Sequence, residues 1–155
     1  MKLQVEIQVA CGEPVPEETD IRQWIAAALD KTTPGRRAAE VVVRLVGEPE
    51  MLRLNRRYRG RNSATNVLAF PWDPPSEAKS ALLGDIVICA GVVAGEAAQQ
   101  GKALAAHWCH LLVHGCLHLL GYEHGKASAA RAMESMEREI LGSLGFPCPY
   151  SGAGL

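Results

Sequence analysis

Hydrophobic and polar residues alternate over the first ten positions of the chain. The apolar residues Leu3, Val5, Ile7 and Val9 are separated by polar ones. A period of two is typical of a β-strand with one buried face. Runs rich in β-branched and other apolar residues predict three more strands, at residues 40–46, 67–70 and 82–89.

Apolar residues three or four positions apart predict helices elsewhere. Five such segments are present: residues 20–31, a helix that starts at Pro49, and residues 92–100, 103–120 and 128–144. In the second of these helices, the spacing puts Met51, Leu54 and Tyr58 on the inner face. Strands and helices alternate early and helices cluster late. This order predicts an α+β fold: a small mixed four-stranded sheet covered by helices, with residues 103–120 as the central helix.

Length and composition indicate one folded unit. The 155 residues are 48% hydrophobic and 21% charged, which is typical of a globular protein and predicts a single domain over residues 1–155. Residues 145–155 are expected to form a loose C-terminal tail. No apolar run is long enough to span a membrane, and the alternating N-terminus does not resemble a signal peptide. The five cysteines form no C-x-x-C pair, so we expect reduced thiols and a cytoplasmic protein.

Three histidines, His114, His118 and His124, form the pattern H-x3-H-x5-H. Residues four apart share one face of a helix, so the first two imidazoles should lie side by side. Gly121 can adopt the left-handed conformation that ends a helix, which would let His124 return as a third ligand. Three protein ligands and an open position are the arrangement of a catalytic zinc site. The pattern therefore predicts one Zn²⁺ per chain. His110, one turn earlier, is interpreted as a structural histidine, with orientation of a ligand or transfer of a proton as the alternatives.

The same spacing occurs in metzincin peptidases, whose motif is H-E-x-x-H-x-x-G-x-x-H. In a peptidase, the glutamate after the first histidine is the general base. This sequence has Gly115 at that position, so it lacks the proton shuttle of peptide hydrolysis. A metallopeptidase-like hydrolase remains the alternative enzyme class.

A second cluster is basic. Five arginines fall within nine residues, in a chain whose net charge is only -1: Arg53, Arg56, Arg57, Arg59 and Arg61. Arginine binds phosphate through a planar fork of donors, so the cluster indicates an anionic substrate, of which nucleic acid is the commonest large one. A solvated helix face is the alternative interpretation. Aromatic residues are only 5% of the chain and do not by themselves indicate base stacking.

Three stretches together resemble signatures of the YbeY family of bacterial ribosomal RNA maturation factors: residues 54–71, 83–88 and 107–124. The resemblance covers roughly residues 40–146. It implies a zinc-dependent endoribonuclease that is specific for single-stranded RNA. It also implies a role in maturing the 3′ end of the small-subunit (16S) ribosomal RNA and in ribosome quality control. By position, the resemblance implies that His114, His118 and His124 bind zinc and that Arg59 is the functional arginine.

These expectations suggest how a phosphodiester would be cleaved. Zinc would activate water and polarise a phosphoryl oxygen, and Arg59 would neutralise charge in the transition state. His114 and Arg59 are thus the candidate catalytic residues, and Arg56, Arg57 and Arg59 the candidate RNA-binding residues. Either water or the RNA 2′-hydroxyl could be the nucleophile. A ribosome-assembly factor with a structural zinc is the non-enzymatic alternative, but the three-ligand pattern favours an enzyme.

Overall fold

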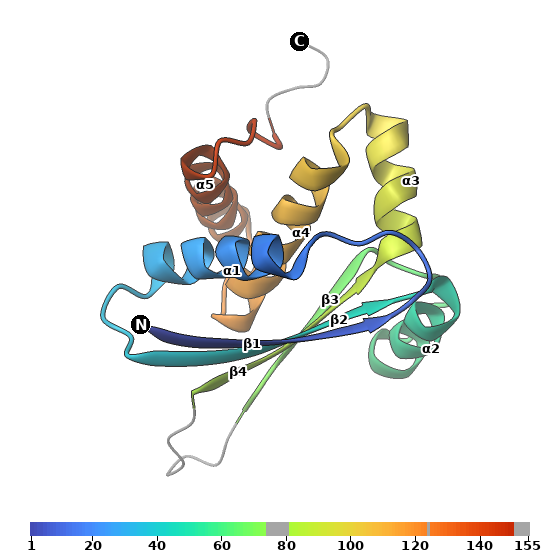
Figure 1. The fold of residues 1–155 in the computed structure, drawn as a ribbon, viewed down its shortest axis with the longest axis horizontal. Coiled ribbons are helices and arrows are strands. Elements are labelled where there is room, and N and C mark those ends of the chain that lie inside the picture. Colours follow the sequence, from blue (N-terminus) through green and yellow to red (C-terminus); the bar gives the residue numbers. More distant parts are fainter. Residues whose placement is uncertain (74–80, 124, 151–155) are drawn as a thin grey trace.

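The structure, a computed structural model, describes residues 1–73, 81–123 and 125–150 (Figure 1). Each strand and helix that the sequence predicts is present there. Most of the loop at residues 71–80 and the ligand candidate His124 lie outside the described residues. The elements, in chain order, are β1 (Lys2–Ala10), α1 (Glu18–Thr32), β2 (Ala38–Val46), α2 (Glu48–Arg59), β3 (Val67–Pro71), β4 (Leu82–Cys89), α3 (Ala90–Gln100), α4 (Leu104–Leu119) and α5 (Ala127–Ser143).

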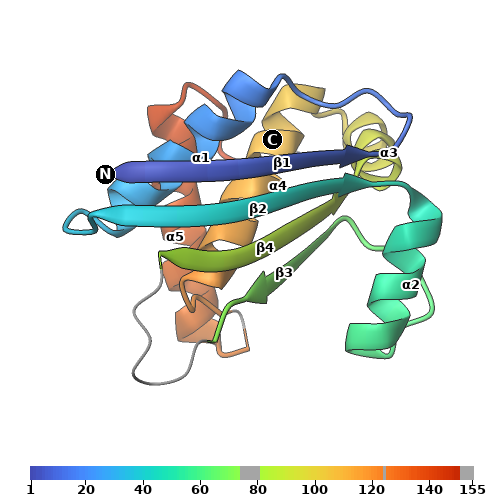
Figure 2. The same cartoon turned by 60° about the horizontal axis from the view of Figure 1, so that its bottom comes forward.

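The four strands form one mixed sheet with the order β1-β2-β4-β3 (Figure 2). β1 pairs in parallel with β2, and β2 in parallel with β4, whereas β3 is antiparallel to β4. The predicted mixed four-stranded sheet is confirmed. Its order places β3 at the edge, next to β4 on one side only.

Helices α1, α4 and α5 lie behind the sheet in Figure 2 and cover one of its faces. The core between these layers consists of fully buried side chains such as Ile21, Val43, Ile86, Leu112 and Leu117. α4 contacts β3, β4 and the helices α1, α3 and α5. The predicted central position of this helix is therefore confirmed.

Gly115 lets α4 approach the sheet closely. A Cβ atom at this position would lie 2.9 Å from Cγ2 of Ile86, a fully buried residue of β4. Interiors are packed too densely to absorb such a contact without movement. The residue that takes the place of the metzincin glutamate thus faces the sheet and fits there because it has no side chain.

α2 packs on the other face of the sheet, in a small cluster of Val46, Met51, Leu68, Val87 and Cys89. Met51 is fully buried, but Tyr58, which was expected on the same inner face, is 56% exposed. Its ring still packs against Phe70 of β3, with centroids 5.1 Å apart, so Tyr58 faces the sheet but is not buried there. The buried residues of α2 are Met51 and Asn55.

The chain after α5 also differs from expectation. The ring of Phe146 packs edge-on against Trp24, with centroids 5.9 Å apart. The ring of Tyr150 packs against His110 at 5.5 Å. Residues 145–150 therefore contact the body of the protein instead of forming a loose tail, because two aromatic side chains bury surface there. Residues 151–155 lie outside the described part.

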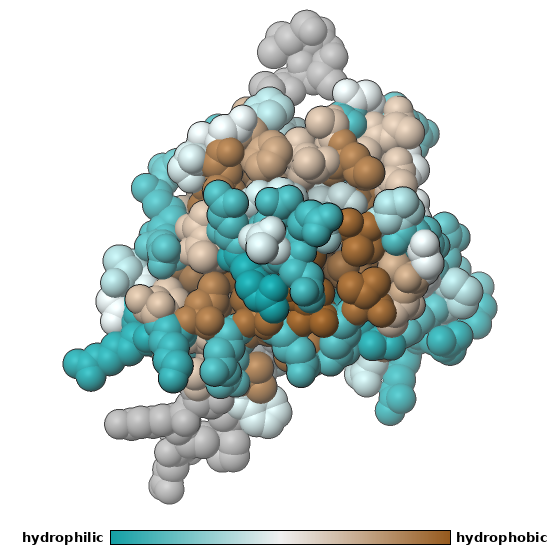
Figure 3. Space-filling model, viewed as in Figure 1, coloured by the Kyte–Doolittle hydropathy of each residue, from teal (hydrophilic) through white to brown (hydrophobic). Residues whose placement is uncertain are grey.

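None of the described helices is long and apolar enough to cross a membrane. On the face seen in Figure 3, hydrophobic areas lie on both sides of a central group of hydrophilic residues.

Candidate active site

The end of α4 shapes the site. The N–H of Gly121 donates to the carbonyl of His118, and the N–H of Tyr122 donates to the carbonyl of Leu117, each at 3.0 Å. This pair of bonds is a Schellman motif, which requires a left-handed residue at its turn. Gly121 has φ of 96°, as predicted. The chain therefore reverses shortly after His118. The reversal places Tyr122 and Glu123 in the lining of a cavity that His114 and His118 also line.

His114 and His118 lie side by side on α4. Their Nε2 atoms are 3.0 Å apart, and the rings are nearly perpendicular, at 80°. Both side chains are partly exposed, so an ion could reach them. Two converging imidazole nitrogens suit a transition metal such as zinc. The role of His124 as third ligand stays a prediction.

Glu137, on α5, is a charged residue that the sequence analysis did not single out. Its carboxylate is completely buried. Oε1 lies 2.5 Å from Nδ1 of His114, and Oε2 lies 3.0 Å from Nε2 of His110. The hydroxyl of Tyr150 donates to the same Oε2. Burial alone would raise the pKa of Glu137, but the hydrogen bonds from His110, His114 and Tyr150 lower it to about 2. The group is thus an anion at neutral pH.

A signal for Glu137 was present in the sequence. The residue follows Met133 by four positions and precedes Ile140 by three, so it lies on the apolar stripe of α5. A lone carboxylate on a buried stripe requires a partner inside the protein. Its partners are the histidines of α4.

His114 uses its two ring nitrogens in different directions. Nδ1 contacts Glu137, and Nε2 contacts His118. A metal-binding histidine commonly has its second nitrogen held by a carboxylate, which orients the ring.

His110, His114 and Glu137 form a second possible ligand group, because their ligand atoms lie within 4.8 Å of one another and could hold a metal themselves. The two possible ligand groups share His114. His110 is hydrogen-bonded to Glu137, which also contacts His114. This position is compatible with a structural role and with a role in orienting His114.

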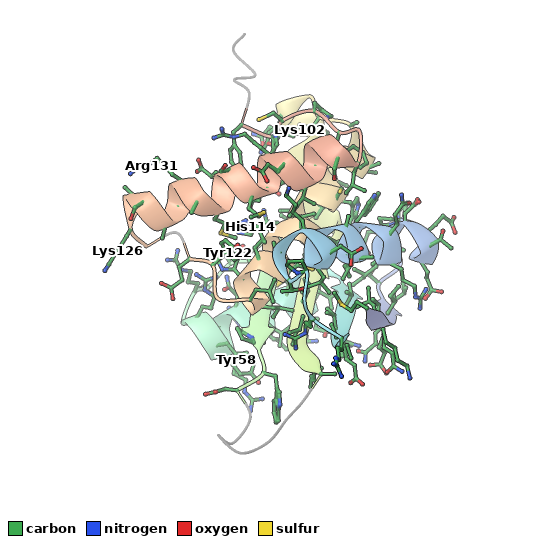
Figure 4. All side chains as sticks on the ribbon, turned by 90° about the vertical axis from the view of Figure 1, so that its left-hand side faces the viewer. Tyr58, Lys102, His114, Tyr122, Lys126 and Arg131 are labelled. Atoms are coloured by element: carbon green, nitrogen blue, oxygen red, sulfur yellow. The ribbon has the colours of Figure 1, made fainter. Side chains whose placement is uncertain are left out.

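A cavity of about 520 Å³ lies in front of the two histidines. Its described lining residues are Arg59, Thr65, Asn66, Val67, Ala69, Pro71, His114, His118, Gly121, Tyr122 and Glu123. Arg59, the last residue of α2, thereby lines the same cavity as histidines that are more than fifty positions away in sequence. Figure 4 looks onto this side of the molecule, with His114 and Tyr122 near the centre and Tyr58 below them. We call this cavity the cleft.

Arg56 and Arg57 do not belong to the described lining of the cleft. Nε of Arg56 donates to Oδ1 of Asn62 at 2.5 Å. The guanidinium of Arg57 lies over the ring of Tyr58, 5.4 Å from its centroid. Both are exposed, so their expected binding of RNA stays a prediction, and the structure brings only Arg59 of the three to the histidines.

Asn66 is held in the wall of the cleft by a polar network. Its Nδ2 donates to Oε1 of Glu96 at 3.0 Å, and Nε2 of His107 lies 2.9 Å from the same oxygen. His107 is buried on α4. The network therefore connects the loop before β3 with the helix that carries the histidines.

The fold and the cleft define an α+β protein with a histidine-based candidate metal centre beside an arginine. The comparisons with known proteins agree with this class and narrow it. The sequence pattern of the family described as endoribonuclease YbeY matches residues 8–145. The chain belongs to the YbeY family of endoribonucleases, which are hydrolases that act on RNA.

Curated relatives lead to the same family. An endoribonuclease YbeY of Pseudomonas putida is 49% identical over 150 residues, which cover 96% of this chain and 94% of that protein. One of Pseudomonas fluorescens is 48% identical, with 96% and 97% covered. A protein of Thermotoga maritima solved in solution has a similar fold, with a TM-score of 0.58 and 21% identity over 96% of this chain and all of that one.

Proposed function

We propose that this protein is a zinc-dependent endoribonuclease that cleaves single-stranded RNA as one domain over residues 1–155. Its proposed substrate is the precursor of the small-subunit ribosomal RNA, matured at its 3′ end in the cytoplasm and monitored in ribosome quality control. Membership of the YbeY family supports the activity. The observation that carries it is that Arg59, His114 and His118 line one cleft.

The donor set fits zinc. His114 and His118 already present two Nε2 atoms to one point, and His124 would complete three protein ligands. When bound, zinc supplies Lewis-acid activation of water and of a phosphoryl oxygen. The buried Glu137 anion holds the ring of His114, so this ligand is oriented before the metal arrives.

Arg59 supplies the positive charge at the substrate. Its side chain is exposed at the edge of the cleft, so a phosphate can approach it from solvent. A guanidinium stays charged at every relevant pH and donates two parallel hydrogen bonds to phosphate oxygens. Charge on those oxygens increases in the transition state, so the interaction strengthens there and accelerates cleavage.

The packing of Gly115 argues against a peptidase. A side chain at the position that would bear the general base would press on Ile86 in the sheet. Glu123 is the one carboxylate among the described cleft residues, and it lies beyond the helix end. A casein or peptide digest should therefore show no hydrolysis.

The test is cleavage of a labelled single-stranded RNA and of its matching duplex by protein of measured metal content. The proposal expects cuts in the single strand alone. A 2′,3′-cyclic phosphate on the product would identify the 2′-hydroxyl as nucleophile, and a 3′-hydroxyl would identify water. If fully zinc-loaded protein binds ribosomal RNA but cuts neither substrate, the non-enzymatic assembly factor is the better account.

A further inference from the structure

A group of aromatic side chains lies at the edge of the sheet, around the strand β3 that also lines the cleft. The rings of Tyr58, at the end of α2, and Phe70, on β3, meet edge to face with centroids 5.1 Å apart. Tyr58 is 56% exposed, and Trp72, two residues after Phe70, is 50% exposed. The chain contains only three tyrosines, three tryptophans and two phenylalanines, so one of each at this edge is a marked concentration. We call Tyr58, Phe70 and Trp72 the aromatic edge.

The edge strand β3 joins the aromatic edge to the cleft. Val67, Ala69 and Pro71 line the cleft, and successive side chains of a strand point to opposite faces. Phe70 therefore lies on the opposite side of β3, where it meets Tyr58. The N–H of Trp72 still donates to the carbonyl of Leu83 at 2.9 Å, so the strand pairing extends to this residue. A ligand that leaves the cleft over β3 would meet these rings next.

Positive charge accompanies the rings. Arg57 lies over Tyr58, at 5.4 Å from the ring centroid, and Arg59, one residue on, reaches the cleft. Arg57, Tyr58 and Arg59 are consecutive, so a guanidinium group lies on each side of an aromatic ring along the chain. Exposed aromatic rings next to arginines are the features with which proteins bind single-stranded nucleic acid, because the rings stack on bases and the cations hold phosphates.

We propose that the aromatic edge and Arg57 form a stacking site for unpaired RNA bases adjacent to the phosphate held by Arg59. The inference rests on the proposed ribonuclease function and goes beyond it by locating a source of single-strand preference. In a duplex, the bases are stacked on one another and are not available to Tyr58 or Trp72. In a single strand, they can turn outward and stack on protein rings.

The test separates binding from cleavage. Metal-free protein is titrated into a single-stranded RNA that carries 2-aminopurine, whose fluorescence reports stacking, and into the same strand as a duplex. Tyr58→Ala and Trp72→Ala should weaken single-strand binding by about five-fold or more each, because stacking contributes roughly 1–3 kcal/mol per base. Tyr58→Phe keeps the ring and should bind like the wild type. Leu104→Ala, at another exposed apolar residue, is the matched control. Duplex binding should not change.

Equal single-strand affinity and equal 2-aminopurine fluorescence in Tyr58→Ala, Trp72→Ala and the wild type would overturn the stacking site. The ribonuclease proposal would survive that result if the wild type still cleaved single strands. A wild type that cleaves no RNA would overturn the ribonuclease proposal, whereas weaker single-strand binding by Tyr58→Ala and Trp72→Ala would still support the stacking site. Since Tyr58 and Trp72 are half exposed, their replacement should leave folding intact, which circular dichroism can verify.

Discussion

The carboxylate of Glu137 lies 2.5 Å from Nδ1 of His114, and this contact leaves the other nitrogen of the ring directed at His118. Two helices that are separated by the turn at Gly121 are thereby joined at the candidate metal centre. The same carboxylate is held by His110 and by Tyr150, a residue close to the C-terminus. The arrangement of the centre thus depends on α4, α5 and the segment after α5.

Glu137→Gln should weaken metal binding without unfolding the protein. The amide keeps the shape of the side chain but loses the charge that orients His114, and loss of such an outer partner typically reduces metal affinity by about 10–100-fold. Competition with a chromogenic chelator measures this affinity. Glu139→Gln, at an exposed position of the same helix, is the control. Equal affinities in the wild type and Glu137→Gln would show that the contact does not support the metal.

His118→Ala and His110→Ala distinguish the two possible ligand groups. If His114, His118 and His124 bind the ion, His118→Ala should lose it, while His110→Ala should retain close to one equivalent. Inductively coupled plasma mass spectrometry of the purified variants gives the metal content. The opposite pattern would assign the ion to His110, His114 and Glu137.

Gly115→Ala should destabilise the protein by roughly 1–3 kcal/mol, as overpacking in a dense core typically does. The added methyl group would press on Ile86, at 2.9 Å. Gly95→Ala, inside α3 with open space at its Cβ, is the matched control and should be neutral or slightly stabilising. Urea unfolding measures both. A Gly115→Ala protein as stable as the control would contradict the close packing of α4 on β4.

The ion pair between Arg44 and Glu50 should make stability depend on pH. The hydrogen bonds from Arg44 lower the pKa of Glu50 below its usual value of 4.5 in the folded state. The contribution of the ion pair to the free energy of unfolding is therefore complete above pH 4.5 and is lost as the pH falls through the lower, folded-state pKa of Glu50. Both side chains are partly exposed, so the effect should be only about 0.3–1 kcal/mol. Urea unfolding from pH 7 to pH 3 should show a smaller decrease for Arg44→Met than for the wild type, and equal decreases would contradict the pairing.

Local patterns predicted the elements well, because alternation in residues 3–9 and helical spacing in residues 20–31 report directly on which side of each element is buried. The position of β3 at the sheet edge depends on pairing with β4, which local periodicity does not encode. Tyr58 has the right spacing for the inner face of α2 and contacts Phe70 of β3, but spacing alone does not reveal that more than half of its side chain stays exposed at the helix end.

The candidate site was predicted in part. His114, His118 and Gly121 lie within one local motif, so their arrangement followed from helix geometry. The arginine cluster alone does not reveal which of its five members lies near the histidines. That depends on the path of the chain between α2 and β3, which places Arg59 in the cleft lining. Glu137 and Tyr150 reach His110 and His114 only through tertiary packing, although the buried position of Glu137 on α5 could have indicated a polar partner.

The most direct test of a metal-centred ribonuclease is the single-turnover cleavage rate of one single-stranded RNA by the wild type, His118→Ala and Arg59→Ala, with metal content measured in each. We expect His118→Ala to lose both metal and cleavage. We expect Arg59→Ala to keep its metal but to cleave about 10²–10³-fold more slowly, because one donor to transition-state charge is removed. Cleavage at the wild-type rate by both folded variants would contradict the assignment of catalysis to this cleft.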